Sequence, residues 1–156
     1  MSLLQKASII TTPTAYAEDY LYSIKPALRV SDTEIITNGD FSNGLTNWTA
    51  STSPPTLNAD NTVTFDSSTE FIFQSISKTV GRRYRLTFDG TGNLRYRTGF
   101  AGTDAPTKEI VLPAVIDIVA TSNTNRVQPY GSTLGTGILK SISLKEITDA
   151  DFDFDR

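Results

Sequence analysis

The sequence predicts an all-β protein, a jelly-roll β-sandwich of about eight or nine strands preceded by an extended N-terminal arm. Short runs of β-branched and aromatic residues recur at roughly even spacing, bounded by Gly, Asn, Asp and Pro. The clearest run, Arg83–Asp89, alternates apolar and polar residues with the period of two that is typical of a half-buried strand. No window shows the helical period of 3.6. A sequence of many short strands without helices favours a sandwich.

Residues 1–33 form a first segment, which we interpret as an arm. Residues 7–13 are rich in β-branched side chains and end at Pro13, and residues 16–26 fit either one short helical turn or an extended hairpin. The segment is too short to build a core alone. We therefore expect it to pack on its own domain or on a partner subunit.

Residues 34–147 carry the predicted sandwich. The turn sequence Gly90-Thr91-Gly92-Asn93 predicts a hairpin between the two alternating runs that flank it. Taken in order, the expected strands are Glu34–Thr37, Thr62–Phe65, Glu70–Ser77, Arg83–Asp89, Leu94–Thr98, Lys108–Leu112, Ala114–Thr121, Asn125–Tyr130 and Ile138–Ile147.

Residues 148–156 form an acidic connector in which Asp alternates with Phe. This segment holds four Asp and one Arg, so it accounts for the whole net charge of −3 and leaves residues 1–147 neutral. It is either a solvated acidic tail or an extended strand whose Phe152 and Phe154 dock against a neighbour.

The composition excludes several classes of function. The chain has no His and no Cys, which rules out disulfides, Cys/His zinc sites, thiol nucleophiles and His-based triads. Its slightly acidic balance argues against binding to nucleic acid. No apolar run is long enough for a transmembrane helix, so we expect no membrane insertion, and the first residues lack the pattern of a signal peptide.

Carboxylates lie in no recognisable catalytic motif, so we expect no enzyme activity, no catalytic residue and no cofactor. Most of them are predicted in turns or on outward strand positions, where solvated charge is ordinary. The candidates considered are Asp60, Asp66, Glu70, Asp89, Asp104, Glu109 and Asp117.

A sugar site needs an aromatic face and a few planar polar groups. The candidates for glycan contact are Tyr96, Tyr130 and Gln128, with Phe100, Asn93 and Arg97 nearby in sequence. Tyr96 alternates with Leu94 on an inward face, which equally fits a core residue. Tyr130 follows Pro129 at a strand end and is expected to be exposed, whereas Trp48 is expected in the core.

Arginine is concentrated in the predicted hairpin. Arg85, Arg95 and Arg97 are expected to share its outer face. One interpretation is a solvated face neutralised by nearby carboxylates. The other is a contact with an acidic neighbouring subunit or an anionic polysaccharide, because Arg pairs well with carboxylates at interfaces.

Three segments resemble carbohydrate-binding-module-like jelly rolls: residues 34–48 with the sequence N-G-D-F before a Gly and a Trp, residues 74–88, and the closing residues 137–147. Asn-Gly suits a turn with positive φ, and Phe41 and Trp48 are large enough to close one end of a sandwich. Such jelly rolls often hold Ca²⁺ through an Asp in the last strand. Lys140 stands there instead and cannot ligate a cation, so we expect no metal and infer that its charge replaces the ion.

The flanking segments resemble the beginnings of tailed-bacteriophage fibre and receptor-binding proteins: residues 1–10, Tyr16, residues 23–26 and the ending D-A-D-F-D-F. The resemblance implies a homotrimeric tail or head fibre on the virion surface, which contributes to host adhesion and touches host polysaccharide. Its arm would bind another virion protein, a tail or capsid adaptor, through Leu3, Leu4, Ile9, Ile10, Tyr16, Tyr20 and Tyr22. The alternative is a stand-alone carbohydrate-binding module of a secreted glycan-active protein.

Overall fold

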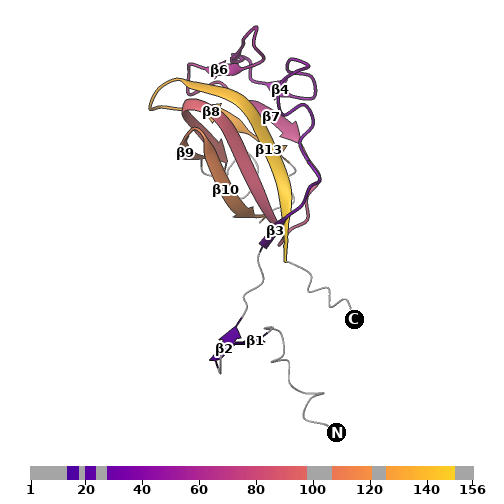
Figure 1. The fold of residues 1–156 in the computed structure, drawn as a ribbon. Helices are drawn as coiled ribbons and strands as arrows, with labels where there is room; N and C mark the ends of the chain where they lie inside the picture. The colour runs from indigo at the N-terminus through magenta and orange to yellow at the C-terminus, as the bar shows by residue number, and fades with distance from the viewer. Residues whose placement is uncertain (1–13, 18–19, 24–27, 98–106, 121–125, 150–156) are drawn as a thin grey trace. The chain divides into compact units, whose positions relative to one another are not determined.

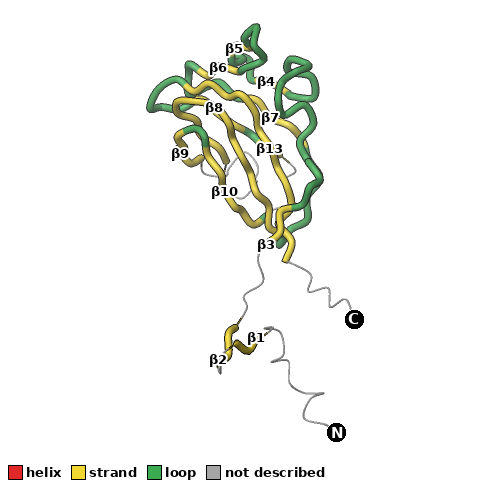
Figure 2. Tube along the Cα trace, in the orientation of Figure 1, coloured by secondary structure: helices red, strands yellow, loops and turns green. Residues whose placement is uncertain are grey.

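The computed structural model describes residues 14–17, 20–23, 28–97, 107–120 and 126–149 (Figures 1 and 2). Every regular element in these ranges is a β-strand, and the paired strands run antiparallel. The predicted all-β sandwich is therefore confirmed. No helix in these ranges is long and apolar enough to cross a membrane.

The chain divides into two compact units, Val30–Ile147 and a second unit made of Met1–Arg29 with Thr148–Arg156. In the second unit, β1 (Thr14–Ala17) and β2 (Tyr20–Ser23) pair as an antiparallel hairpin, with Tyr16 opposite Leu21. Of the two conformations that the sequence left open here, the structure has the hairpin. The arm candidates Leu3, Leu4, Ile9 and Ile10 lie outside the described residues.

The first sheet of the sandwich is ordered β10-β8-β13-β6-β5, with β3 added on β13 (Figure 1). Its longest members are β8 and β13, which pair along ten register positions and so form the centre of the sheet. The strands are β3 (Leu28–Val30), β5 (Thr56–Leu57), β6 (Val63–Phe65), β8 (Arg83–Arg97), β10 (Ala114–Val119) and β13 (Gly137–Asp149).

The second sheet runs from β4 through β7 and β11/β12 to the second half of β8 and then β9. β11 pairs with β7 with Arg126 opposite Ser75, and a bridge between Phe71 and Tyr130 continues the same register into β12. β12 in turn pairs with the second half of β8. The strands are β4 (Thr49–Ala50), β7 (Ile72–Ser75), β9 (Thr107–Val111), β11 (Arg126–Val127) and β12 (Pro129–Gly131).

β8 belongs to both sheets, and the predicted hairpin within it is wrong. Its first half pairs with β10 and β13, and its second half pairs with β9 and β12. The glycines at 90 and 92 have φ of 150° and 82°, which lets the strand bend from one sheet into the other without reversing. Even-numbered residues face the core on both sides of this bend, from Tyr84 to Tyr96.

The core lies between the two sheets and is closed at one end by the loop of residues 36–48. Phe41 is fully buried and packs against Trp48 with ring centroids 5.7 Å apart, so both residues are in the core as predicted. The indole Nε1 of Trp48 donates to the carbonyl of Asn38. The buried amide of Gln74 binds the backbone of Thr37, which fastens this loop to β7.

The predicted strand at Glu34–Thr37 is wrong, because these residues form a loop. The carboxylate of Glu34 accepts hydrogen bonds from the backbone of Ile36 and Leu144. A side chain that binds the backbone in this way competes with strand pairing. The short strands β4 and β5 were not predicted.

Candidate functional site

The outward side of the second sheet carries the densest group of aromatic and planar polar side chains among the described residues. Val127 and Ile72 point into the core, so their sequence neighbours point outward. We define the arginine–aromatic face as the following outward residues: Phe71, Phe73, Arg95, Arg97, Arg126, Gln128 and Tyr130.

Cross-strand register arranges this face in two rows. The first row runs Glu109, Arg95, Tyr130, Phe71 from β9 to the residue that precedes β7. Continuing the same registers by two residues places Arg97, Gln128 and Phe73 in the second row. Side chains directly opposite one another on neighbouring strands are close enough to interact.

Tyr130 is the centre of the first row. It is 8% exposed and lies outside the hydrophobic core cluster, on the outward side of the sheet. Its ring lies 5.3 Å from that of Phe71, and the guanidinium carbon of Arg97 lies 5.0 Å from its centroid. Arg97 Nε also donates to the Tyr130 hydroxyl. The prediction that Tyr130 is exposed is therefore wrong.

Arg126 packs against Phe73 of the second row. Its guanidinium carbon is 3.9 Å from the centroid of the Phe73 ring, which is a close cation–π contact. Among the described residues, no carboxylate lies within 4.0 Å of this guanidinium. An arginine packed on an aromatic ring can still donate its N–H groups to an anion.

Gln128 is 6% exposed, and within the described part of the chain its side-chain amide has no hydrogen-bond partner. Every fully enclosed side-chain nitrogen or oxygen of the described residues does have a partner, so the amide of Gln128 must reach the surface. Gln128 thus has a buried stem and an accessible, unpaired polar tip. Its position next to Arg97 places that tip on the arginine–aromatic face.

Tyr96 is not on this face but in the core, which is the alternative that the sequence left open for it. It is 5% exposed, belongs to the core cluster and packs against Phe88 with ring centroids 6.1 Å apart. Burial raises the pKa of its hydroxyl. Tyr96 lies on the same strand as Arg95 and Arg97 but points to the opposite side, as its alternation with Leu94 allowed.

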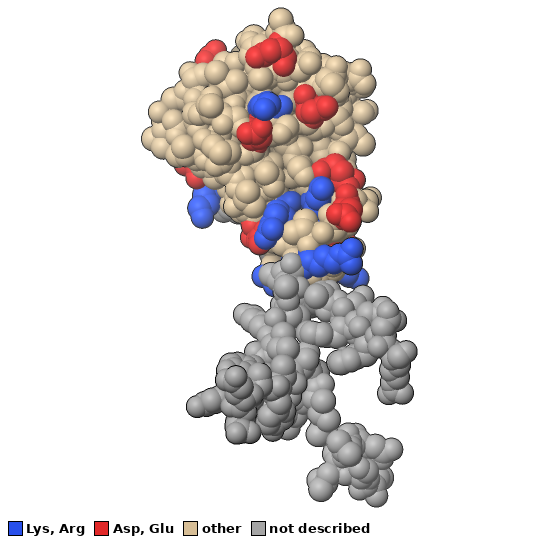
Figure 3. Space-filling view, viewed as in Figure 1, with Lys and Arg blue, Asp and Glu red and all other residues tan. Residues whose placement is uncertain are grey.

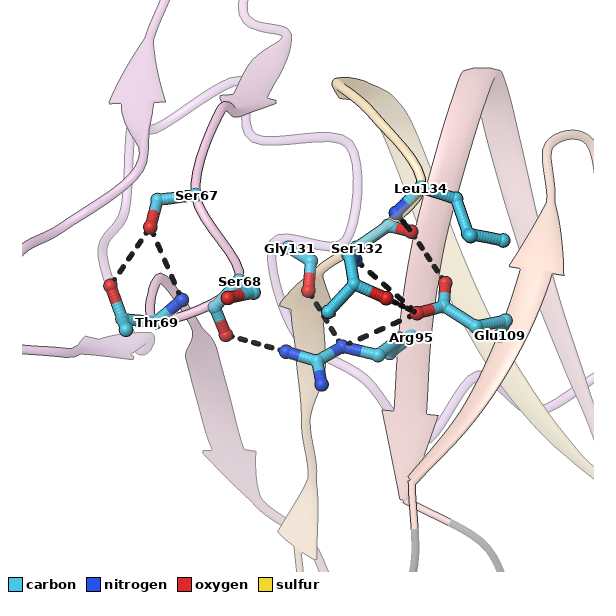
Figure 4. A network of polar contacts seen from close by, with 9 residues as sticks. Ser67, Ser68, Thr69, Arg95, Glu109, Gly131, Ser132 and Leu134 are labelled. Carbon is cyan, nitrogen blue, oxygen red and sulfur yellow. Dashed lines mark hydrogen bonds and ion pairs between the residues drawn. The ribbon is translucent and has the colours of Figure 1, made fainter.

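Arg95 connects three segments of the fold (Figure 4). Its Nε donates to the carbonyl of Gly131, and its Nη2 donates to the carbonyl of Ser68. Glu109 lies beside it, with 3.7 Å between Nε and Oε1. An arginine with these partners stabilises the end of β12 and the loop before β7, so it is mainly a structural residue of its own chain.

Glu109 is held in its ionised form by the same network. Partial burial raises the pKa of its carboxyl group. Hydrogen bonds from Ser132 and Thr133, together with the charge of Arg95, lower this pKa by more, so the net pKa is below the ordinary value. The negative charge is therefore retained at the edge of the face and is already compensated there.

Arg85 lies elsewhere, so the predicted cluster of three arginines on one hairpin is wrong. Arg85 and Arg95 are ten residues apart along β8, on opposite sides of its bend at Gly90. Arg85 makes a bidentate pair with Asp117 on β10, at 2.8 Å for each bond. The hydrogen bond to Asp117 raises the pKa of Arg85, and the same bond lowers the pKa of Asp117.

The first sheet carries opposite charges side by side. Arg82 pairs with Glu146 at 2.8 Å, and Lys140 lies 3.5 Å from Asp89. On the surface seen in Figure 3, Lys and Arg side chains lie next to Asp and Glu, mostly toward the end where β3 lies. Lys140 has a side chain that is 70% exposed, and the inference that its charge replaces an ion stays a prediction. The described residues contain no group of three or more acidic side chains placed to hold a metal.

Comparison with solved structures gives partial likenesses of fold. No protein-family model and no curated protein matches the chain. It is similar to the enzymatically active domain of tailspike protein 4 of bacteriophage CBA120, with 14% identity and a TM-score of 0.47 over 72% of this chain. It is also similar to a family two carbohydrate esterase from Cellvibrio japonicus, with 15% identity and a TM-score of 0.40 over 67% of this chain.

The chain spans 21% of that tailspike chain and 32% of that esterase chain. Likeness of this extent is too low to carry an activity, a substrate or a site to this protein. The functional argument therefore depends on the residues of the chain itself.

Sequence reasoning identified Arg97, Tyr130 and Gln128 but missed Phe71, Phe73 and Arg126. The alternation of Phe71 and Phe73 with Ile72 and Gln74 was a usable signal, because it places both phenylalanines on one side of a strand. Phe100 and Asp104 lie outside the described residues.

Proposed function

We propose that the chain is a non-enzymatic structural protein of a bacteriophage virion, a fibre protein that attaches through residues 1–33 and presents its β-sandwich for host adhesion. The support from sequence is the resemblance of residues 1–10, Tyr16, residues 23–26 and the D-F-D-F ending to phage fibre proteins. The protein would act on the particle surface as a homotrimer, with a tail or capsid adaptor as its partner.

The observation that carries this proposal is the pairing of the segments by which the chain enters and leaves the sandwich. β3 pairs with β13, Ser31 N donates to Glu146 O at 2.8 Å, and Ile35 N donates to Leu144 O at 3.0 Å. A domain whose two ends lie side by side can be attached to a continuing chain at one place. The rest of its surface is then available for contact, which suits a module carried on a fibre.

The carboxylates of the sandwich support a non-enzymatic role, since several of them have structural partners. Glu70 accepts hydrogen bonds from the backbone of Asp66 and Ser67, and Asp60 accepts them from Thr62. Glu109 and Asp117 are paired with arginines. Carboxylates held in this way stabilise turns and sheet edges and are poorly suited to exchange protons with a substrate.

The experiment that tests the proposal is complementation of a phage that lacks the chain. Particles produced with the full chain are compared with particles produced with a chain lacking residues 1–30, and the copy number is measured by mass spectrometry. We expect the truncated chain to fold, by circular dichroism, and to be absent from particles. Retention of the truncated chain at the full copy number would contradict the proposed anchoring.

A second function is favoured by one observation, the arginine–aromatic face. A stand-alone carbohydrate-binding module of a secreted protein requires such a face and does not require residues 1–33. That alternative predicts a monomer by light scattering and sugar binding that survives removal of residues 1–30. The fibre proposal instead predicts a trimer for the full chain.

A further inference from the structure

The arginine–aromatic face has the composition of a binding site for an anion attached to a ring. It contains three arginines and only one neighbouring carboxylate of the described part of the sheet, Glu109, which is already bonded to Arg95, Ser132 and Thr133. Arg126 therefore adds a positive charge that no carboxylate of the described residues compensates. On the first sheet, in contrast, Arg82 and Arg85 each have a carboxylate partner at 2.8 Å.

Two polar side chains at the same end of the face are placed to meet a ligand. Arg126 is stacked on Phe73 at 3.9 Å, with no carboxylate partner among the described residues. Gln128 is more than nine-tenths buried, and in the described part of the chain its amide is unpaired. Because this amide reaches the surface, its donor and acceptor groups are accessible to a ligand.

These groups also have the chemistry to distinguish a carboxylated sugar from a neutral one. A guanidinium binds the two oxygens of a carboxylate through parallel N–H donors, and stacking on an aromatic ring fixes its plane before the ligand arrives. An amide supplies a donor and an acceptor for neighbouring hydroxyl groups. The half-buried ring of Phe71 offers apolar area to the C–H face of a sugar.

We propose that the arginine–aromatic face binds a carboxylated saccharide, with the carboxylate on Arg126 and the adjacent hydroxyl groups on Gln128. This inference deepens the proposed role in host adhesion, on which it rests, by assigning the class of polysaccharide. Arg97 and Tyr130 orient one another through their hydrogen bond and form the floor beside the Gln128 amide. Arg95 fixes the strand ends that carry the face and does not need to touch the ligand.

The test is binding of the purified full chain to four carboxylated polymers and one neutral polymer, measured by biolayer interferometry. The carboxylated probes are alginate, hyaluronate, polygalacturonate and polysialate, and the neutral probe is dextran. We expect at least one carboxylated polymer to bind while dextran does not. Esterification of the bound polymer's carboxyl groups should abolish its binding.

Variants separate this site from a general effect of charge. Arg126→Ala should weaken binding about tenfold, the loss expected for a hydrogen-bonded charge, and Gln128→Ala should weaken it severalfold. Arg126→Lys keeps the charge but loses the planar set of N–H donors and the stacking on Phe73, so it should not restore binding. The matched control is Arg82→Ala, which removes the same charge from an exposed pair on the first sheet and should leave binding unchanged.

Three results would overturn the inference: no binding to any carboxylated polymer, equal binding to dextran, or an equal loss in Arg126→Ala and Arg82→Ala. Circular dichroism of each variant excludes unfolding as the cause of a loss. Incorporation into particles is measured separately and does not depend on sugar binding. Failure of the saccharide assay with normal incorporation would therefore leave the fibre proposal intact.

Discussion

The two halves of β8 share one alternating pattern but have different surroundings. In the first half, Arg85 is 37% exposed and forms a bidentate pair with Asp117 at the protein surface. In the second half, the Arg95 side chain is 19% exposed and binds two backbone carbonyls, and Arg97 packs against the ring of Tyr130. Alternation along a strand fixes which side a residue faces, whereas the neighbouring strands decide what it meets there.

The largest expected effect comes from breaking the bend that separates the two halves. In Gly90→Ala the new Cβ would lie 2.1 Å from the carbonyl oxygen of Ile138, at a φ of 150°. Backbone atoms of two central strands would have to separate, so we expect a loss of about 3 kcal/mol or more in the free energy of unfolding. Urea denaturation followed by fluorescence of Trp48 measures it.

The matched control is Gly81→Ala. Gly81 also has a positive φ, 85°, but an added Cβ there meets no atom within 4 Å. That substitution should cost about 1 kcal/mol, the backbone term alone. Equal losses in the two variants would show that β8 does not pass from one sheet to the other at Gly90.

A smaller difference is expected between the arginines of the two halves. Arg95→Ala leaves the carbonyls of Gly131 and Ser68 without their donor, so we expect a loss of about 2 kcal/mol in unfolding free energy. Arg85→Ala removes an ion pair with partly exposed members and should cost at most about 1 kcal/mol. Chemical denaturation of both variants at pH 7 compares them, and a larger loss for Arg85→Ala would reverse the assignment of structural and surface roles.

The smallest effect concerns acid stability. The pKa of Glu109 is lowered in the folded protein, so its stabilisation is present above the unfolded pKa and is lost as the pH falls through the folded pKa. Between about pH 5 and pH 3, the wild-type Tm should therefore fall more than the Tm of Glu109→Gln. Differential scanning calorimetry of both proteins at both pH values measures the fall in Tm of each. Equal falls in Tm would show that the ionised carboxylate is not stabilised by the network around Arg95.

Much of the fold was predictable from particular residues. Alternation of Tyr84, Leu86 and Phe88 with polar residues gave the inward face of β8, and the size of Phe41 and Trp48 gave the closed end of the core. The hairpin prediction failed because glycines permit both a reversal and a bend, and only the pairing partners, here β9 and β12, decide between them.

The candidate site was less predictable because it depends on strands that are distant in sequence. Tyr130 looked exposed from its place beside Pro129, yet Phe71 and Arg97 cover it across two strand pairings. Arg126 and Phe73 are more than 50 residues apart in the sequence, and their stacking follows from the β7–β11 register. Long-range register of this kind leaves little signal in a single sequence.

The most direct test of the contrast between the two sheets is an NMR titration of arginine Nε–Hε resonances with a carboxylated oligosaccharide, hexamannuronate from alginate or trigalacturonate. The account predicts that the signals of Arg126 and Arg97 shift in a saturable way with one of these ligands, whereas the signal of Arg85, bonded to Asp117, does not move. An equal response of Arg85, or no response of Arg126 to either oligosaccharide, would contradict the assignment of the binding face to the second sheet.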